Sequence, residues 1–210
     1  MPKILGDNHR LFIESFLRKK HNENNRMKVR SSFIKKKNQY MYPVQVYLSF
    51  NFSLLFRDDM YFTAAIKMQK NYESYAMCSE NGKISCVSEG FLENYLALDW
   101  PLFYEKINIF YLIPDIFTKC KEFPVDKNER FFQVLKSEIV DFYCPKNMSL
   151  FRILLMNENL EINQEYLNRF ISNNSGLFKK HRLLISLRIE NFCFSEENQL
   201  KILLFTIHHF

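Results

Sequence analysis

Glycine is scarce in this sequence, which has only 4 glycines among its 210 residues. Phosphate-binding loops need several closely spaced glycines, because their backbone amides must approach the phosphate without obstruction by side chains. The composition therefore argues against a nucleotide site of that kind. Large apolar rings are abundant instead, with 22 phenylalanines and 11 tyrosines. Such a composition is typical of a chain that folds around a packed core and not of a disordered one.

Paired cysteines are also lacking, since no Cys-x-x-Cys motif occurs and the five cysteines lie far apart. They are Cys78, Cys86, Cys120, Cys144 and Cys193. An odd number at this spacing argues against both a disulfide framework and a zinc site. Reduced and mostly buried thiols are typical of a cytosolic chain, so we expect a cytoplasmic location.

Long apolar runs and catalytic motifs are missing as well. The longest apolar runs, 107–113 and 200–207, are far shorter than the roughly 20 residues that span a bilayer. Neither Gly-x-Ser-x-Gly nor His-Glu-x-x-His occurs, and these motifs carry common serine and zinc hydrolases. We therefore expect no membrane span and no enzyme, and the sequence assigns no catalytic, cofactor-binding or metal-binding residue.

Histidines and cysteines offer only weak candidates for bound cofactors. His208 and His209 are adjacent on an expected strand, so their side chains point to opposite faces and chelate a metal poorly. We expect His9 to be a partly exposed helix residue and not a haem ligand. Cys78 and Cys86 lie outside any Asn-Cys-Arg-Phe motif of a flavin-bonding cysteine, so buried structural thiols are the better interpretation. We expect neither haem nor flavin.

The net charge of +6 does not by itself indicate a nucleic-acid partner. Lysines are spread along the chain, and three of them, Lys35 to Lys37, are consecutive. A nucleic-acid binder more often gathers basic and aromatic residues on one face. The excess of Lys, Asn, Phe and Ile is also typical of an AT-rich genome. We therefore expect a protein partner, a second copy of the chain or a small apolar ligand, and not nucleic acid.

The first 70 residues predict one helix followed by three strands. Residues 7–19 carry apolar side chains at helical spacing, and residues 27–31 begin an alternating pattern. Apolar and polar residues alternate most clearly over 44–52, which predicts a half-buried strand that returns over 61–68 after a turn at Asp58-Asp59. Pro43 lacks an amide proton, so we expect it at the start of its strand or on a sheet edge.

The remaining residues predict a hairpin, several helices and two long strands. Asn81-Gly82 favours a type I′ turn between strands 75–79 and 83–87. Ser88 is the expected cap of the helix that follows. Further along the chain we expect helices at 103–120 (broken at Pro114), 126–143 and 164–172, and strands at 150–156, 183–189 and 200–208 after a turn at 195–198.

The two longest strand pairs match when the first is shifted by about 139 positions along the sequence. Val44 and Val46 then fall on Leu183 and Ile185, and strand phase and turn length are kept. Any two long hairpins can look alike, which is the alternative explanation. A true repeat makes residues 1–70 the end of one unit and 71–210 a second, complete unit with a helical insertion. The second unit has two strands, helices and then a closing strand set, which is the element order of a PAS fold.

Several short segments resemble the PAS-domain region of large ciliate proteins of the TmcB/TmcC-like type. MPKILGDNHRLFIESFL followed by YMYPVQVYLSF is similar to the later half of such a domain, through Met1-Pro2, His9, Phe16-Leu17 and Tyr42-Pro43. YAMCSENGKISCVSEGF is similar to the opening hairpin and helix of a following domain. The resemblance covers about the first 95 residues and supplies no catalytic residue. It implies a cytosolic region of a family whose members are generally membrane proteins.

Together these observations predict an α+β fold in which antiparallel sheets carry helices on one face, PAS-like, with an incomplete first unit. The function that we expect is a non-catalytic signalling or interaction module that binds a partner or a small ligand. A structural subunit of a larger assembly and an enzyme of unrecognised class are the alternatives. Phe91, Tyr95 and Phe205 are the bulky residues expected to fill the hollow between helices and sheet.

Overall fold

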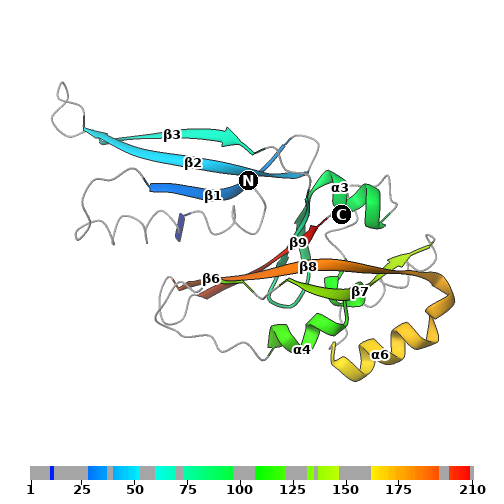
Figure 1. Ribbon diagram of the computed structural model, residues 1–210. Helices are drawn as coiled ribbons and strands as arrows, with labels where there is room; N and C mark the ends of the chain where they lie inside the picture. The colour runs from blue at the N-terminus through cyan, green and yellow to red at the C-terminus, as the bar shows by residue number, and fades with distance from the viewer. Residues whose placement is uncertain are drawn as a thin grey trace.

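The computed structural model has two antiparallel sheets and several short helices (Figure 1). It describes residues 10–11, 28–36, 40–52, 60–69, 73–96, 107–121, 132–134, 137–146, 162–193 and 199–208. The expected α+β class and the antiparallel pairing are confirmed. Of the expected first helix, only Arg10 and Leu11 belong to the described residues, and both are helical. The expected strand at 150–156 and the turns at Asp58-Asp59 and 195–198 lie outside the described residues.

The smaller sheet is a meander of three strands in the order β1-β2-β3. Its strands are β1 (Lys28–Lys35), β2 (Met41–Phe52) and β3 (Met60–Met68). Pro43 is the third residue of β2, which is the central strand and not an edge. Its position near the strand start limits the loss to one ladder bond, and its carbonyl still accepts a hydrogen bond from the Gln69 amide at 3.0 Å.

The larger sheet has six strands in the order β5-β4-β9-β8-β6, and β7 also pairs with β8. The bounds are β4 (Ser74–Ser79), β5 (Ile84–Val87), β6 (Phe132–Val134), β7 (Glu138–Pro145), β8 (Phe178–Cys193) and β9 (Gln199–His208). The expected hairpin and the two long closing strands are therefore confirmed. Strand β4, the first of this sheet along the chain, pairs with β9, the last, near the middle of the sheet.

The β4–β5 turn differs from the expected type I′ turn. The Gly82 amide donates to the Ser79 carbonyl at 2.9 Å, and the Ser79 amide donates to Lys83. These bonds enclose a three-residue loop, 80–82, whose last residue Gly82 has a φ of 80°. Three-residue hairpin loops commonly end in a residue of positive φ. Asn-Gly thus marked the hairpin correctly, while the loop is one residue longer than the pattern predicts.

The expected helix at 126–143 is wrong over its second half, because residues 138–145 form β7 and 132–134 form β6. Apolar residues in this segment fit a helical stripe and an alternating strand equally well. In the structure Val140, Phe142 and Cys144 are buried, while Ile139 is 71% exposed. Pairing with β8 along the whole of β7 decides the outcome, since tertiary contacts override a local period of this kind.

Short helical elements connect the strands of the larger sheet. They are α3 (Glu89–Phe91), the π-helical turn η2 (Leu92–Leu96), the 3₁₀ turn η4 (Ile109–Tyr111), α4 (Asp115–Lys121), α6 (Gln164–Asn173) and the 3₁₀ turn η5 (Ser175–Leu177). The expected helix at 164–172 is confirmed, and Asn163 caps it by accepting from the Tyr166 amide at 2.8 Å. The expected helix at 103–120 is confirmed only over α4 and the turn before it, because Asn108 has extended backbone and bridges to Lys83.

Ser88 stands at the expected N-cap position, but its side chain makes no capping bond. Its hydroxyl instead accepts a hydrogen bond from the Tyr75 amide at 2.8 Å, across the β4–β5 hairpin. The first turn of α3 is therefore tied to the strand beside it. This bond positions the following residues Phe91 and Leu92 over the sheet, where both are buried.

Alternating residues of β4 and β9 belong to two separate hydrophobic clusters on opposite faces of the larger sheet. Ala76, Cys78 and Phe205 face the helical layer. Tyr75, Met77 and Leu204 face the other way and pack against Met41 of β2. Phe33 of β1 packs its ring edge-on against Tyr75, with centroids 5.3 Å apart. Residues of α3, α4 and α6 thus pack against one face of the larger sheet, and residues of the smaller sheet pack against the other. In Figure 1, α4 and α6 lie below β8 and the smaller sheet lies above it.

The two long hairpins keep the phase that the repeat predicts but differ in register. Val46 pairs with Ile66 in the smaller sheet, whereas its counterpart Ile185 pairs with Ile207 and not with Phe205. A register difference of two residues preserves the face on which each side chain lies. The connection between β8 and β9 is also shorter than that between β2 and β3, so the expected equal turn length is wrong.

Candidate functional site

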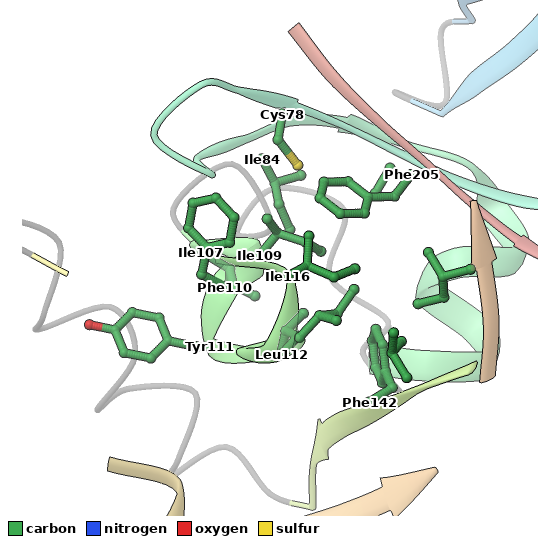
Figure 2. Close-up of a cluster of buried hydrophobic side chains, with 14 of the residues drawn as sticks. Cys78, Ile84, Ile107, Ile109, Phe110, Tyr111, Leu112, Ile116, Phe142 and Phe205 are labelled. Atoms are coloured by element: carbon green, nitrogen blue, oxygen red, sulfur yellow. The ribbon is translucent and has the colours of Figure 1, made fainter. Parts of the chain in front are cut away.

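The space between the larger sheet and its helices is filled by side chains. Figure 2 shows Cys78 and Phe205 of the sheet pointing toward Ile109 and Ile116 of the helical segment. Phe91 and Phe205 are fully buried, and Tyr95 is 6% exposed. These three residues, which the sequence singled out, therefore occupy the interior.

Aromatic contacts bind this interior together across elements that are distant in sequence. The Tyr95 ring lies 5.4 Å from Phe142, and Phe91 packs edge-on against the same ring at 6.1 Å. On the other side, Tyr111 lies 5.0 Å from Phe170 of α6. Aromatic pairs at such distances add to the free energy of burial. These residues belong to one continuous cluster of buried side chains beneath the sheet.

Four cysteines, Cys78, Cys86, Cys120 and Cys144, are buried free thiols, as expected for structural cysteines. Burial raises the pKa of the Cys78 thiol well above its usual value, and the neighbouring Cys120 adds to this. Burial also raises the pKa of Cys144, partly offset by Lys179. A thiol held in its neutral form is a weak nucleophile, so these positions do not favour thiol chemistry.

These raised pKa values lead us to expect a loss of stability at alkaline pH. In the unfolded chain a thiol ionises near pH 8.5, whereas burial in the folded protein raises the pKa of Cys78 and Cys144. Their contribution is complete below about pH 8.5 and decreases as the pH rises beyond that value. Burial raises the pKa of Tyr95 and Tyr111 as well, which extends the loss above pH 10. The urea midpoint should be lower at pH 10 than at pH 7.5.

The matched variant for this measurement is Cys78→Ala, which removes the fully buried thiol from the core. The decrease in urea midpoint between pH 7.5 and pH 10 should be smaller in the variant than in the unsubstituted chain. An unsubstituted chain whose midpoint rises between these two pH values would contradict this assignment.

A chain of polar side chains crosses one end of the larger sheet. The His208 Nδ1 atom lies 3.0 Å from Glu73 Oε1, and its Nε2 atom lies 2.7 Å from the Ser186 hydroxyl oxygen. The Tyr75 hydroxyl donates to the other Glu73 oxygen at 2.7 Å, and the hydroxyls of Ser186 and Ser137 lie 2.5 Å apart. We call this set, Tyr75, Glu73, His208, Ser186 and Ser137, the polar chain.

The polar chain joins a carboxylate, an imidazole and a hydroxyl in the order that activates a serine nucleophile. A ring that donates from Nδ1 to Glu73 accepts at Nε2 from Ser186, which is the arrangement of a base beside its nucleophile. His208 is 27% exposed and Glu73 34%. The same bonds also join the start of β4 and the end of β9 to the middle of β8, so a structural role accounts for them equally well.

Sequence reasoning missed the polar chain and discounted one of its members. Glu73 and His208 are 135 positions apart, and Ser186 lies 22 positions before His208, so no local motif signals them. The expectation that His208 and His209 do not form a metal site is not tested for His209, which lies outside the described residues together with His9. Within the described part of the chain, no group of three metal-ligating side chains occurs.

Strand β3 forms the outer edge of the smaller sheet, since β2 is its only neighbour among the described residues. Ala65, Ile66, Lys67 and Met68 are all exposed. Ile66 is 56% and Met68 42% exposed, which is high for large apolar side chains. An open edge with apolar side chains is a ready template for another strand.

A scan against protein-family models finds no match, and neither the curated proteins nor the solved structures give one. The helices in the described part of the chain are all too short or too polar to cross a membrane.

Proposed function

We propose that the chain is a non-catalytic interaction module of PAS type that works by binding a protein partner. The observation that carries this proposal is the order of strands and helices in the larger sheet, together with the buried side chains that fill the space between this sheet and its helices. Two strands, β4 and β5, precede the helices, and β7, β8 and β9 follow them. This is the element order that the resemblance implies. Strands β1 to β3 form a meander with the same order as such a closing set, which supports the view of a preceding partial unit.

The filled interior favours a protein partner over a small ligand. Phe91, Tyr95, Phe142 and Phe205 take up the space in which a PAS-type ligand would lie. Binding a ligand there would require these packed rings to move, at a cost in packing energy. The open β3 edge offers a binding surface without such rearrangement. Two elements depart from the PAS element order: β6, which precedes β7 and pairs with β8, and α6, which lies between β7 and β8.

Site-specific photo-crosslinking in the source cells tests this function. A photoreactive phenylalanine analogue is placed at one of three exposed positions on different elements: Ile66 of β3, Ile139 of β7 and Ser172 of α6. An adduct of discrete mass at one position and not at the others supports an interaction module. Native mass spectrometry of the purified chain provides the second readout. No adduct at any position, or a retained small molecule, would contradict the proposal.

A second candidate function, serine-based ester hydrolysis, is favoured by the geometry of the polar chain. The Ser186 oxygen would bond to the ester carbonyl carbon while its proton passes to His208, and the leaving alcohol would take that proton. Water would then release the acid by the same route in reverse. Glu73 would hold the imidazole in the required orientation, 3.0 Å away.

Labelling with a fluorophosphonate probe separates the two functions. Serine hydrolysis requires that the chain be labelled and that Ser186→Ala and His208→Gln abolish the label, while Ser137→Ala retains it. An unlabelled chain whose thermal midpoint falls in Ser186→Ala identifies the polar chain as structural. The first proposal expects this second outcome.

A further inference from the structure

We propose that the open edge of β3 binds an extended segment in which acidic and apolar residues alternate, which it takes up as a fourth strand of the smaller sheet. This inference rests on the proposed function and names the partner chemistry and the position of binding. Its basis is the direction of the backbone groups of β3, the exposure of its side chains and the charge of its sheet.

The backbone of Ile66 and Met68 faces the open edge. The Gln69 amide donates to the Pro43 carbonyl at 3.0 Å, so Pro43 and Gln69 form a hydrogen-bonded pair. Hydrogen-bonded pairs alternate along an antiparallel ladder. Lys67 with Gln45 and Ala65 with Tyr47 are therefore also bonded pairs. The amide and carbonyl groups of Ile66 and Met68 consequently point away from β2.

The side chains of the same strand divide into two chemical faces. Ile66 and Met68 lie on one face, and Lys67 lies on the other, because side chains alternate along a strand. All three are exposed. An added strand places its own side chains opposite these, where apolar pairs and opposite charges are both stabilising. The complementary segment therefore has apolar residues on the Ile66 face and acidic residues on the Lys67 face.

Backbone contacts from neighbouring segments partly cover two other strand edges in the described part of the chain, those of β5 and β7. The Ile84 amide of β5 donates to the Ile107 carbonyl, and the Ile109 amide donates to Gly82, so segment 107–109 covers this edge. The Tyr143 amide of β7 donates to the Leu112 carbonyl. On the far side of the smaller sheet, β1 packs Phe33 against Tyr75. Among the described residues β1, β3 and β6 each pair with one strand only, and β3 combines such an edge with the exposed apolar side chains of Ile66 and Met68.

The charge of the smaller sheet favours an acidic partner over a second copy of the chain. Strands β1, β2 and β3 contain Lys28, Arg30, Lys35 and Lys67 and no aspartate or glutamate. Two copies joined along β3 would add the exposed Lys67 of each copy to the same strand pair, and like charges on neighbouring strands are destabilising. An acidic strand instead meets complementary charge, which both speeds association and selects against basic competitors.

The experiment measures fluorescence anisotropy of a dye-labelled peptide, Glu-Val-Glu-Ile-Glu-Val-Glu, titrated with the full chain. The basic analogue Lys-Val-Lys-Ile-Lys-Val-Lys and a labelled single-stranded oligothymidine are the comparison probes. We expect the acidic peptide to bind about tenfold more tightly than the basic one at low salt, with the preference decreasing as salt screens the charges.

Two substitutions on β3 locate the site. Ile66→Pro removes an amide that points outward and leaves the ladder with β2 intact, so it should weaken acidic-peptide binding about tenfold or more while the fold is retained. Lys67→Glu should reverse the preference between the acidic and basic peptides. This variant tests the site without introducing a proline into β3. The control is Ile139→Asp, which replaces an exposed isoleucine on β7 and should change nothing.

Three outcomes would overturn the inference. They are binding that Ile66→Pro leaves unchanged in a folded protein, oligothymidine that displaces the acidic peptide, and a dimer in sedimentation analysis that Ile66→Pro dissociates. Unchanged binding in Ile66→Pro would show that the peptide binds elsewhere. Displacement by oligothymidine would assign the edge to nucleic acid, and a dimer that Ile66→Pro dissociates would assign it to a second copy of the chain. A crosslink at position 139 or 172 without peptide binding at β3 would leave the interaction function standing and reject only this site.

Discussion

Replacing Phe142 with alanine is expected to lower the free energy of unfolding by about 3–5 kcal/mol, because the substitution removes a fully buried ring and leaves a cavity. Phe142 is 0% exposed on β7, where Phe91 and Tyr95 pack against its ring. Neighbouring side chains come from different elements and cannot collapse together into the space. Urea unfolding, monitored by far-ultraviolet circular dichroism, measures the change in the free energy of unfolding.

Ile139→Ala is the matched control, and it should change stability by no more than about 0.5 kcal/mol because the side chain is exposed. The pair also distinguishes strand from helix. Residues 139 and 142 would share a face in the helix that the sequence pattern predicts, so both substitutions would then be costly. In β7 they face opposite sides of the sheet. Equal losses for the two variants would contradict the strand.

Gly82→Ala has the second largest expected effect, a loss of about 2–5 kcal/mol of stability. The φ of 80° at this position is costly for any residue with a β-carbon. A β-carbon would also overlap the Phe110 ring and lie 2.5 Å from the Asn108 side-chain oxygen. Phe110 cannot retreat easily, since it is buried and packs edge-on against Phe117 at 5.1 Å.

The control for Gly82 is Gly176→Ala, where a β-carbon would meet nothing within 4 Å. A substitution of this kind is close to neutral or slightly stabilising, because alanine restricts the unfolded chain more than glycine does. Thermal unfolding of the two variants side by side gives the comparison. A Gly82 variant as stable as the Gly176 variant would show that the hairpin loop tolerates a side chain and would contradict the close packing of Phe110 and Asn108 against Gly82.

Strands with a clean alternation were predictable from the sequence, and so was the helix at 164–172, although its cap Asn163 was not identified. β2 and β8 alternate over many residues, and α6 begins after Asn163. The segment that became β7 was not predictable, because its apolar residues fit two periods. Its long partner β8 decides between them, and that partner lies more than 30 residues further along the chain.

The candidate sites were less accessible to sequence reasoning than the fold. Glu73, Ser186 and His208 meet only because the registers of β4, β8 and β9 place the start of β4 and the end of β9 beside the middle of β8. Ile66 and Met68 resemble the apolar residues of any strand until the sheet order shows that β3 pairs only with β2 among the described residues. Strand order and register depend on long-range pairing, which local patterns do not encode.

Amide hydrogen exchange along β3, resolved by nuclear magnetic resonance, tests the central claim most directly. In the free chain we expect slow exchange at Ala65 and Lys67, whose amides bond to β2, and fast exchange at Ile66 and Met68, whose amides face the open edge. Adding the acidic peptide should slow Ile66 and Met68 and leave the other two unchanged. Protection of Ile66 and Met68 in the free chain, or no change in their exchange at saturating peptide, would contradict the account of β3 as the binding edge.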